Sequence, residues 1–173
     1  MSFKNSKPKW DTSKSVVANA KETLPKVAEA YFAEGDKILN EDSSLEDHHE
    51  LRLATKHFRY LLENFEPLYG AGLRSRLADL REVQRILGEL NDCVATKALM
   101  NGRGDSGESL GFLDREAAAK VAEFRQFWSD RFSEAKQRLW LRYFGTQASL
   151  VKRTPRKPGS PASSRLTKNI VNQ

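Results

Sequence analysis

The segment from His48 to Glu63, HHELRLATKHFRYLLE, places apolar residues at helical spacing and basic residues on the opposite side. At about 3.6 residues per turn, its apolar positions gather on one face together with the nearby Phe65. These positions are Leu51, Ala54, Phe58, Leu61, Leu62 and Phe65. The basic positions gather nearly opposite, at His49, Arg52, Lys56 and Arg59. This pattern predicts a helix whose apolar face meets a core and whose basic face is left for an anion.

Three further segments show helical periodicity, and no alternating run of β-branched residues competes with them. Pro25 and Gly35 are expected to kink or fray the first helix, and Ser43 or Ser44 to cap the second. The tight joint after Pro67 should bring the third helix back antiparallel to the second. The sequence therefore predicts an all-α, four-helix bundle-like unit with helices over about 15–40, 45–66, 73–100 and 110–144.

The last predicted helix carries more large apolar residues than one face can hold. Its expected inward positions are Ala117, Val121, Phe124, Trp128, Phe132, Ala135 and Leu139. Phe112, Phe127, Trp140 and Tyr143 fall on other faces, which indicates a second contact surface, for instance with another subunit.

The charge of the chain is unevenly distributed along its 173 residues. Of the 29 Lys and Arg residues, six lie between Thr146 and Gln173, a stretch without acidic residues, so the remaining 23 balance the 23 acidic residues. An anion site in the body must therefore come from sorting charges onto faces rather than from excess charge. We expect a flexible N-terminus over 1–14, one helical domain over 15–145 and a disordered basic tail over 146–173.

Cysteine usage and hydropathy indicate the cellular compartment. Cys93 is the only cysteine, which excludes an internal disulfide and fits a reducing compartment. The N-terminus has no apolar stretch typical of a secretory signal, and no apolar run approaches the roughly 20 residues of a membrane span. We therefore expect a cytoplasmic protein with no membrane span.

The histidines and acidic residues do not form a recognisable catalytic or metal site. His48 and His49 point about 100° apart on a helix, and no third ligand shares a face with either. No nucleophile and base stand at a spacing typical of Ser/His/Asp or Cys/His catalysis. We expect no enzymatic activity, no metal and no cofactor.

The third predicted helix repeats the pattern of the second, with Arg74, Arg81 and Arg85 opposite its apolar side. If the two helices form a symmetric hairpin about residue 69, Arg81 and Arg85 lie level with Lys56 and Arg52. The two basic stripes would then merge into one surface. At about 1.5 Å per residue each stripe spans roughly 15 Å, which favours a long anion over a single phosphate.

Other residues are expected to support this surface. Gly88 would allow close backbone approach near the start of the second helix, and Asp92, on the side of Arg85, would hold a cation in place. For Tyr60 and Gly88, a plain packing role is equally consistent with the sequence.

Two motifs resemble those of the CHAD domain family, the conserved histidine α-helical domain. The pattern HxxRxxxKxxRY is matched by His49, Arg52, Lys56, Arg59 and Tyr60, although His57 stands where Arg or Lys is common. The pattern LQxxLGxxND is matched by Gln84, Leu87, Gly88, Asn91 and Asp92. The resemblance covers residues 45–95 best. It implies a helical domain that binds inorganic polyphosphate along a basic surface.

The resemblance also has limits. Family chains usually contain two such four-helix units and this chain shows one, so a homodimer is expected. The chain lacks the ExExK motif of the triphosphate-processing domain to which some members are fused, so that activity is not implied.

We interpret the chain as a non-enzymatic polyphosphate-binding protein, expected to associate with polyphosphate granules. Two alternatives stay open. One is a histidine phosphotransfer domain with His49 as the acceptor, although the HxLKG pattern of that family is absent. The other is a nucleic-acid-binding protein that uses the basic tail together with the stripes.

Overall fold

The computed structural model describes residues 10–40, 42–102 and 107–146, and within these ranges all regular structure is helical. The helices are α1 (Val16–Lys37), α2 (Leu45–Glu63), α3 (Glu66–Tyr69), α4 (Ala71–Asn101), α5 (Gly107–Arg131) and α6 (Glu134–Thr146). The predicted all-α class is confirmed.

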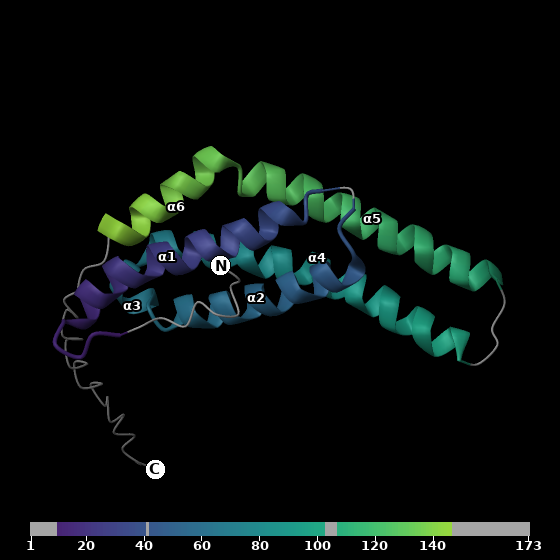
Figure 1. The fold of residues 1–173 in the computed structure, drawn as a ribbon, viewed down its shortest axis with the longest axis horizontal. Helices are drawn as coiled ribbons and strands as arrows, with labels where there is room; N and C mark the ends of the chain where they lie inside the picture. The colour runs from purple at the N-terminus through teal and green to yellow at the C-terminus, as the bar shows by residue number, and fades with distance from the viewer. Residues whose placement is uncertain (1–9, 41, 103–106, 147–173) are drawn as a thin grey trace, which may run out of the picture.

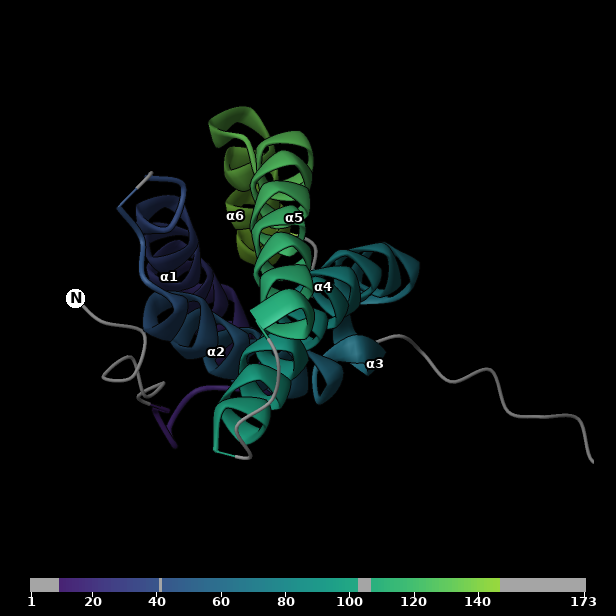
Figure 2. The same cartoon turned by 90° about the vertical axis from the view of Figure 1, so that its right-hand side faces the viewer.

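The helices pack as antiparallel neighbours around one core. α4 is the longest helix; α2 packs along one side of it and α5 along another, while α6 folds back over α1 (Figures 1 and 2). The end of α4 and the start of α5 extend together beyond α1 and α2 as a two-helix arm (Figure 1).

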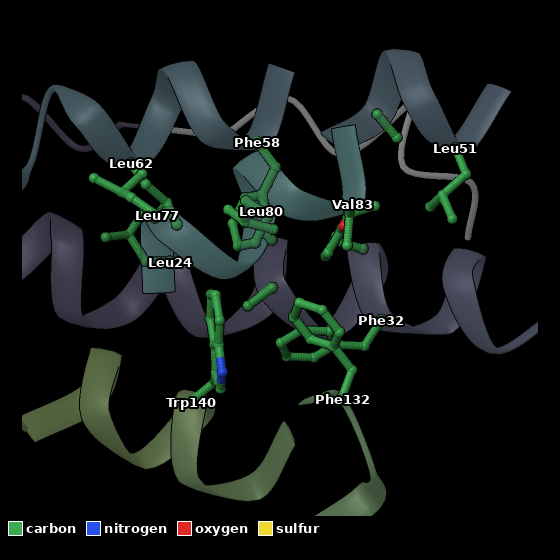
Figure 3. Packing of buried hydrophobic residues seen from close by; sticks show 14 of the residues in the cluster. Leu24, Phe32, Leu51, Phe58, Leu62, Leu77, Leu80, Val83, Phe132 and Trp140 are labelled. Carbon is green, nitrogen blue, oxygen red and sulfur yellow. The ribbon is translucent and has the colours of Figure 1, made fainter. Parts of the chain in front are cut away.

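Large aromatic and aliphatic side chains fill the core. Leu62 of α2 lies by Leu77 of α4 (Figure 3). Phe32 of α1 packs against Phe132, which lies in the bend between α5 and α6. Two buried hydroxyl groups of the core are hydrogen-bonded: the Tyr31 hydroxyl lies 3.1 Å from the Thr55 hydroxyl, which donates to a backbone carbonyl one turn earlier. Burial raises the pKa of the Tyr31 hydroxyl well above its usual value.

A local signal sets the start of α2, and another sets the turn into α4. Ser44 caps its N-terminus and forms a capping box with Asp47, which confirms one of the two predicted caps. The hydrogen bonds from Ser44 hold the pKa of the Asp47 carboxyl below its usual value. After α3, Gly70 adopts φ 66°, a left-handed conformation that favours glycine and lets the chain reverse into α4.

The prediction of one continuous last helix is wrong, because the chain bends between Arg131 and Glu134. Asp36 of α1 holds this bend by accepting hydrogen bonds from the Trp128 indole (2.9 Å) and the Gln137 amide (3.0 Å). No glycine or proline marks the bend in the sequence, and the contacts of Asp36 join its two sides to α1.

The bend changes which residues of the last segment face the core. Trp140 is 4% exposed, whereas Leu139, expected to point inward, is 54% exposed. Ala135 was also expected inward and is exposed. Trp140 and Tyr143 therefore pack against the domain, and only Phe112 of the four off-face aromatics is largely exposed.

Pro25 and Gly35 do not interrupt α1, contrary to expectation. Gly35 instead provides room for a ring from α5. A Cβ atom built at Gly35 would lie 1.9 Å from the Trp128 ring, so the indole packs directly on the helix backbone. Only a residue without a side chain permits this approach.

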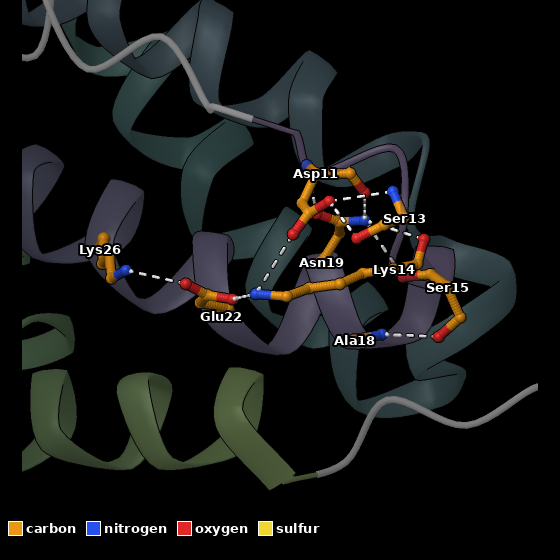
Figure 4. A network of polar contacts seen from close by, with 8 residues as sticks. All are labelled: Asp11, Ser13, Lys14, Ser15, Ala18, Asn19, Glu22 and Lys26. Atoms are coloured by element: carbon orange, nitrogen blue, oxygen red, sulfur yellow. Dashed lines mark hydrogen bonds and ion pairs between the residues drawn. The ribbon is translucent and has the colours of Figure 1, made fainter.

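The domain begins earlier than the predicted residue 15. The Trp10 ring stacks on Phe65 with centroids 5.5 Å apart. The main chain of Asp11 exchanges hydrogen bonds with the Asn19 side chain at 2.9 and 2.8 Å (Figure 4). Residues 10–14 are thus tied to α1 and to the α2–α3 joint rather than flexible.

Several sequence expectations fall outside the described residues. They concern the N-terminus over 1–9, most of the joint over 101–107 and the basic tail after Thr146. Among the described residues, no helix combines the length and the apolar character needed to cross a bilayer.

Substitution of Gly35 tests the contact between α1 and α5. We expect Gly35→Ala to lower the free energy of unfolding by about 1–3 kcal/mol, because Trp128 must move to make room for the methyl group. Urea denaturation measures this change.

The matched control is Gly111→Ala in α5, where the nearest atom to a built Cβ lies 3.7 Å away on Arg115. That variant should keep or slightly gain stability. A Gly35→Ala variant as stable as the wild type would contradict the close approach.

Candidate polyanion-binding surface

The basic face of α2 meets α4 along a line that we call the α2–α4 seam. His49 Nδ1 lies 3.0 Å from Asn91 Oδ1, and Arg59 Nε donates to Gln84 Oε1 at 2.9 Å. Between them, Arg52 lies level with Gly88. The seam is therefore lined by His49, Arg52, Lys56 and Arg59 of α2 and by Arg81, Gln84, Gly88 and Asn91 of α4.

The predicted antiparallel arrangement is confirmed, but its register is shifted. Arg52 was expected level with Arg85 and lies level with Gly88, about one turn further along α4. The short helix α3 stands between α2 and α4, so the two helices are not related by the symmetric turn on which that expectation depended.

Two arginines meet across the seam on one carboxylate. Arg59 Nη1 lies 2.5 Å and Arg81 Nη2 3.3 Å from the same oxygen of Glu63. Arg59 is mostly buried, with its side chain 15% exposed, whereas Arg81 is exposed. Because two cations share one carboxylate, this part of the seam keeps a positive charge.

Tyr60 stands outside the core beside two cations. The Arg59 guanidinium lies 4.4 Å from the centroid of its ring and the Lys56 ammonium 5.9 Å. Such cation–π contacts orient basic side chains without neutralising them. Tyr60 thus lies beside basic residues of the motif, and its supporting role stays a prediction.

Arg52 and Lys56 form no ion pair within the described parts of the chain. Lys56 is exposed, and Arg52 lies over Gly88 with its Nε buried and without a hydrogen-bond partner there. An arginine without a counter-ion retains its full set of charged donors for an external anion.

The group that Gly88 admits is a side chain rather than a backbone. A built Cβ at this position would meet Arg52 Nε at 3.9 Å, which is ordinary van der Waals contact. The expected close approach of the two helix backbones at Gly88 is therefore wrong. Gly88 instead leaves the surface of α4 flat where Arg52 crosses it.

Arg85 turns away from the seam toward α5. Its guanidinium contacts Glu82 at 2.7 Å, Glu89 at 2.6 Å and Glu123 at 2.5 Å. Lys120 of α5 binds two of the same carboxylates, at 2.7 and 2.8 Å. With three carboxylates for two cations, this α4–α5 network has no spare positive charge, contrary to the expectation that Arg85 extends the basic stripe.

The network shifts the titration of its members. The hydrogen bonds that Arg85 donates to Glu82, Glu89 and Glu123 raise the pKa of its guanidinium. Lys120, and then Arg85, hold the pKa values of the Glu89 and Glu123 carboxyls below their usual range. These shifts favour the charged forms of Arg85, Glu89 and Glu123 near neutral pH.

Arg74 and Asp92 are both exposed on α4, about five turns apart. Arg74 Nε lies 3.7 Å from Glu66 of α3, and the Arg74 side chain is widely exposed. Asp92 is exposed on the same helix, but the carboxylates that hold Arg85 are Glu82, Glu89 and Glu123. The spacing of Glu82 and Glu89 from Arg85 could have revealed two of these partners in the sequence.

A cavity of about 220 Å³ lies at the end of the seam where α2 begins. His48, only 2% exposed, lines it together with His49, Asn91 and Val94. His48 Nδ1 donates to the Ser44 carbonyl at 2.7 Å, and its Nε2 is buried without a partner in the described structure. In the sequence only the helical phase, which places His48 nearer the core, separates His48 from His49.

Substitution of Gly88 separates the two interpretations of this residue. We expect Gly88→Ala to keep or raise the free energy of unfolding, by up to about 1 kcal/mol, since alanine is the better helix former and meets no close atom. Thermal or urea denaturation measures it. A loss of more than about 1 kcal/mol would show that some atom lies closer to this position than Arg52 Nε, which is 3.9 Å from the built Cβ.

Comparison with known proteins supports the motif-based resemblance. Searches of curated proteins and of solved structures find no significant match to this chain. The model of the CHAD domain family matches residues 3–101, which include α1 to α4 and both sides of the seam. The match covers more than half of the sequence, and the chain therefore belongs to the CHAD domain family.

Proposed function

We propose that this chain binds inorganic polyphosphate along the α2–α4 seam and does so without enzymatic activity. The observation that carries the proposal is the pair Arg52 and Lys56, which lie in the family motif and form no ion pair with a described carboxylate. A linear polymer with one negative charge per phosphate suits cations repeated along a helix pair.

The spacing of the seam favours a polymer over a small anion. His49 and Arg59 are separated by about 15 Å along α2, at 1.5 Å of rise per residue. A single phosphate group contacts only one or two of these side chains at a time. A chain of several phosphates can contact His49, Arg52, Lys56 and Arg59 together.

The two kinds of cation have different roles. The Arg52 and Arg59 guanidiniums offer fixed pairs of N–H donors that match two phosphate oxygens, while Lys56 adds a mobile point charge. Arg81 contributes positive charge from α4, because Glu63 can neutralise only one of the two arginines that share it. The surface can therefore hold phosphates from both sides of the seam.

Ion pairs at the seam do not prevent anion binding. Exposed pairs such as Arg81 with Glu63 and Arg74 with Glu66 contribute about 0–1 kcal/mol each, so phosphate oxygens can replace the carboxylates. Arg85 is different because three carboxylates surround it. We therefore expect Arg85 to contribute least among the residues that the sequence analysis assigned.

The family resemblance extends the proposal to assembly and location. We propose that two chains form a homodimer that supplies two seams, and that the protein associates with polyphosphate granules. Sedimentation velocity of the full chain, with and without polyphosphate, tests the dimer. A monomer under both conditions would exclude it.

Arginine and lysine variants test the seam. We expect Arg52→Ala and Lys56→Ala each to weaken binding of fluorescently labelled long-chain polyphosphate by about tenfold, because each removes a charge-assisted contact. Arg85→Ala should weaken it by less than about threefold. Fluorescence anisotropy at several salt concentrations measures the Kd, which should rise steeply with salt.

The control variant is Lys26→Ala, an exposed lysine of α1 that forms an ion pair with Glu22. Its Kd should equal that of the wild type. An equal loss of polyphosphate affinity in Lys26→Ala and Arg52→Ala would show that binding follows overall charge, which would contradict a binding site at the seam.

Competition experiments separate polyphosphate from nucleic acid. Unlabelled RNA and DNA should displace labelled polyphosphate poorly at fixed salt if the seam is built for the inorganic polymer. Equal displacement by RNA, lost when the chain is truncated after Thr146, would favour a nucleic-acid-binding tail instead.

A further inference from the structure

A second cluster of basic residues lies in a surface pocket where α4, the end of α5 and α6 meet. The pocket has a volume of about 210 Å³. Its polar and aromatic lining comprises Ser75, Arg76, Asp79, Arg131, Lys136 and Trp140. Asp79 and Arg81 are two residues apart and so point about 200° apart around α4, which places this pocket on the other side of the helix from the seam.

Arg76 is the central feature of the pocket. The helix and two aromatic rings hold it in place: its guanidinium lies 3.8 Å from the Tyr143 centroid and 5.4 Å from that of Trp140. Its Nη1 donates to the Gly72 carbonyl at 3.0 Å, whereas its Nε is buried and has no partner among the described residues. Burial lowers the pKa of this guanidinium.

A half-buried cation without a counter-ion is costly to desolvate, and aromatic faces compensate only in part. No described carboxylate lies within ion-pair distance of Arg76. The Arg76 side chain is therefore preorganised and still lacks the negative partner that would satisfy it.

The other cations of the pocket leave room for an anion as well. Arg131 makes two hydrogen bonds to Asp79, at 2.7 and 3.0 Å, which neutralises that carboxylate. Lys136 donates to the backbone carbonyl of Asp130 and has no carboxylate partner in the described ranges. Three cations thus face one carboxylate around the pocket.

We propose that this pocket binds a terminal phosphate group, with Arg76 and Lys136 as its charged ligands and Ser75 as a neutral donor. The volume is many times the space that one water molecule needs, so a phosphate with part of its hydration shell fits. The terminal phosphate can come from free pyrophosphate or from the end of a polyphosphate chain. This site does not depend on the seam, since the two share no residue.

The test uses the full chain labelled with ¹⁵N and titrated with pyrophosphate. The Ser75 amide and the Trp140 indole resonances should shift saturably. Arg76→Gln should raise the Kd for pyrophosphate by about tenfold or more, and Lys136→Ala by about threefold or more, since each removes a charged donor. The control Arg138→Gln alters an exposed arginine of α6 that pairs with Glu134 outside the pocket, and should change nothing.

Lys136 is exposed, so its variant keeps the test decisive even if Arg76→Gln fails to fold. Absence of saturable shifts at Ser75 and Trp140, or an unchanged Kd in Lys136→Ala, would overturn the proposal. Lys56→Ala should leave pyrophosphate binding intact, which keeps failure of this site distinct from failure of the seam.

A second arm identifies the source of the phosphate. Long-chain polyphosphate is compared with pyrophosphate at equal concentrations of terminal groups, in the Lys56→Ala variant. Shifts at Ser75 with both anions support a site for chain ends as well as for free pyrophosphate. Shifts with pyrophosphate alone support a site for the small anion, and shifts with neither overturn the proposal.

Discussion

The packing of the apolar face of α2 on α4 determines the rest of the candidate site. Leu51, Phe58 and Leu62 are fully or almost fully buried, as are Leu77, Leu80 and Leu87 on α4. These residues fix both the rotation and the register of the two helices. The packing therefore also sets which polar residues of α2 and α4 are neighbours at the edge of the contact. Arg52 meets Gly88 and Arg59 meets Gln84 for that reason. A change of register by one turn would align a different set of charges.

Charge in this protein is sorted rather than accumulated. Outside the basic tail, acidic and basic residues are equal in number, yet they are unevenly distributed over the surface. Two arginines share Glu63 at the seam, whereas three carboxylates surround Arg85 and Lys120 on the α4–α5 side. The same helix therefore presents a cationic edge toward α2 and a balanced edge toward α5. Anion binding at the seam does not require a basic body.

The bend between α5 and α6 links the core to the second pocket. Asp36 accepts hydrogen bonds from Trp128 and Gln137, which directs α6 back across α1. That direction buries Trp140 and brings Tyr143 against Arg76. A continuous helix, as the apolar periodicity of the segment predicts, would carry these aromatic residues away from α4. The Arg76 pocket thus depends on the contacts of Asp36, near the end of α1, with both sides of the bend.

The sequence by itself determined the helical class, the start of α2 and the opposed apolar and basic faces of α2 and α4. These properties depend on residues close together in the chain, through helical periodicity, capping by Ser44 and the left-handed Gly70. It could not determine the carboxylate that reaches Arg85 from α5, the bend held by Asp36 or the ring seated on Gly35. Each of these joins residues from different helices, and their meeting depends on the packing angle and register of whole elements. Only the tertiary structure therefore decided which cations stay without a carboxylate partner, because neutralisation of a side chain depends on its neighbours in space.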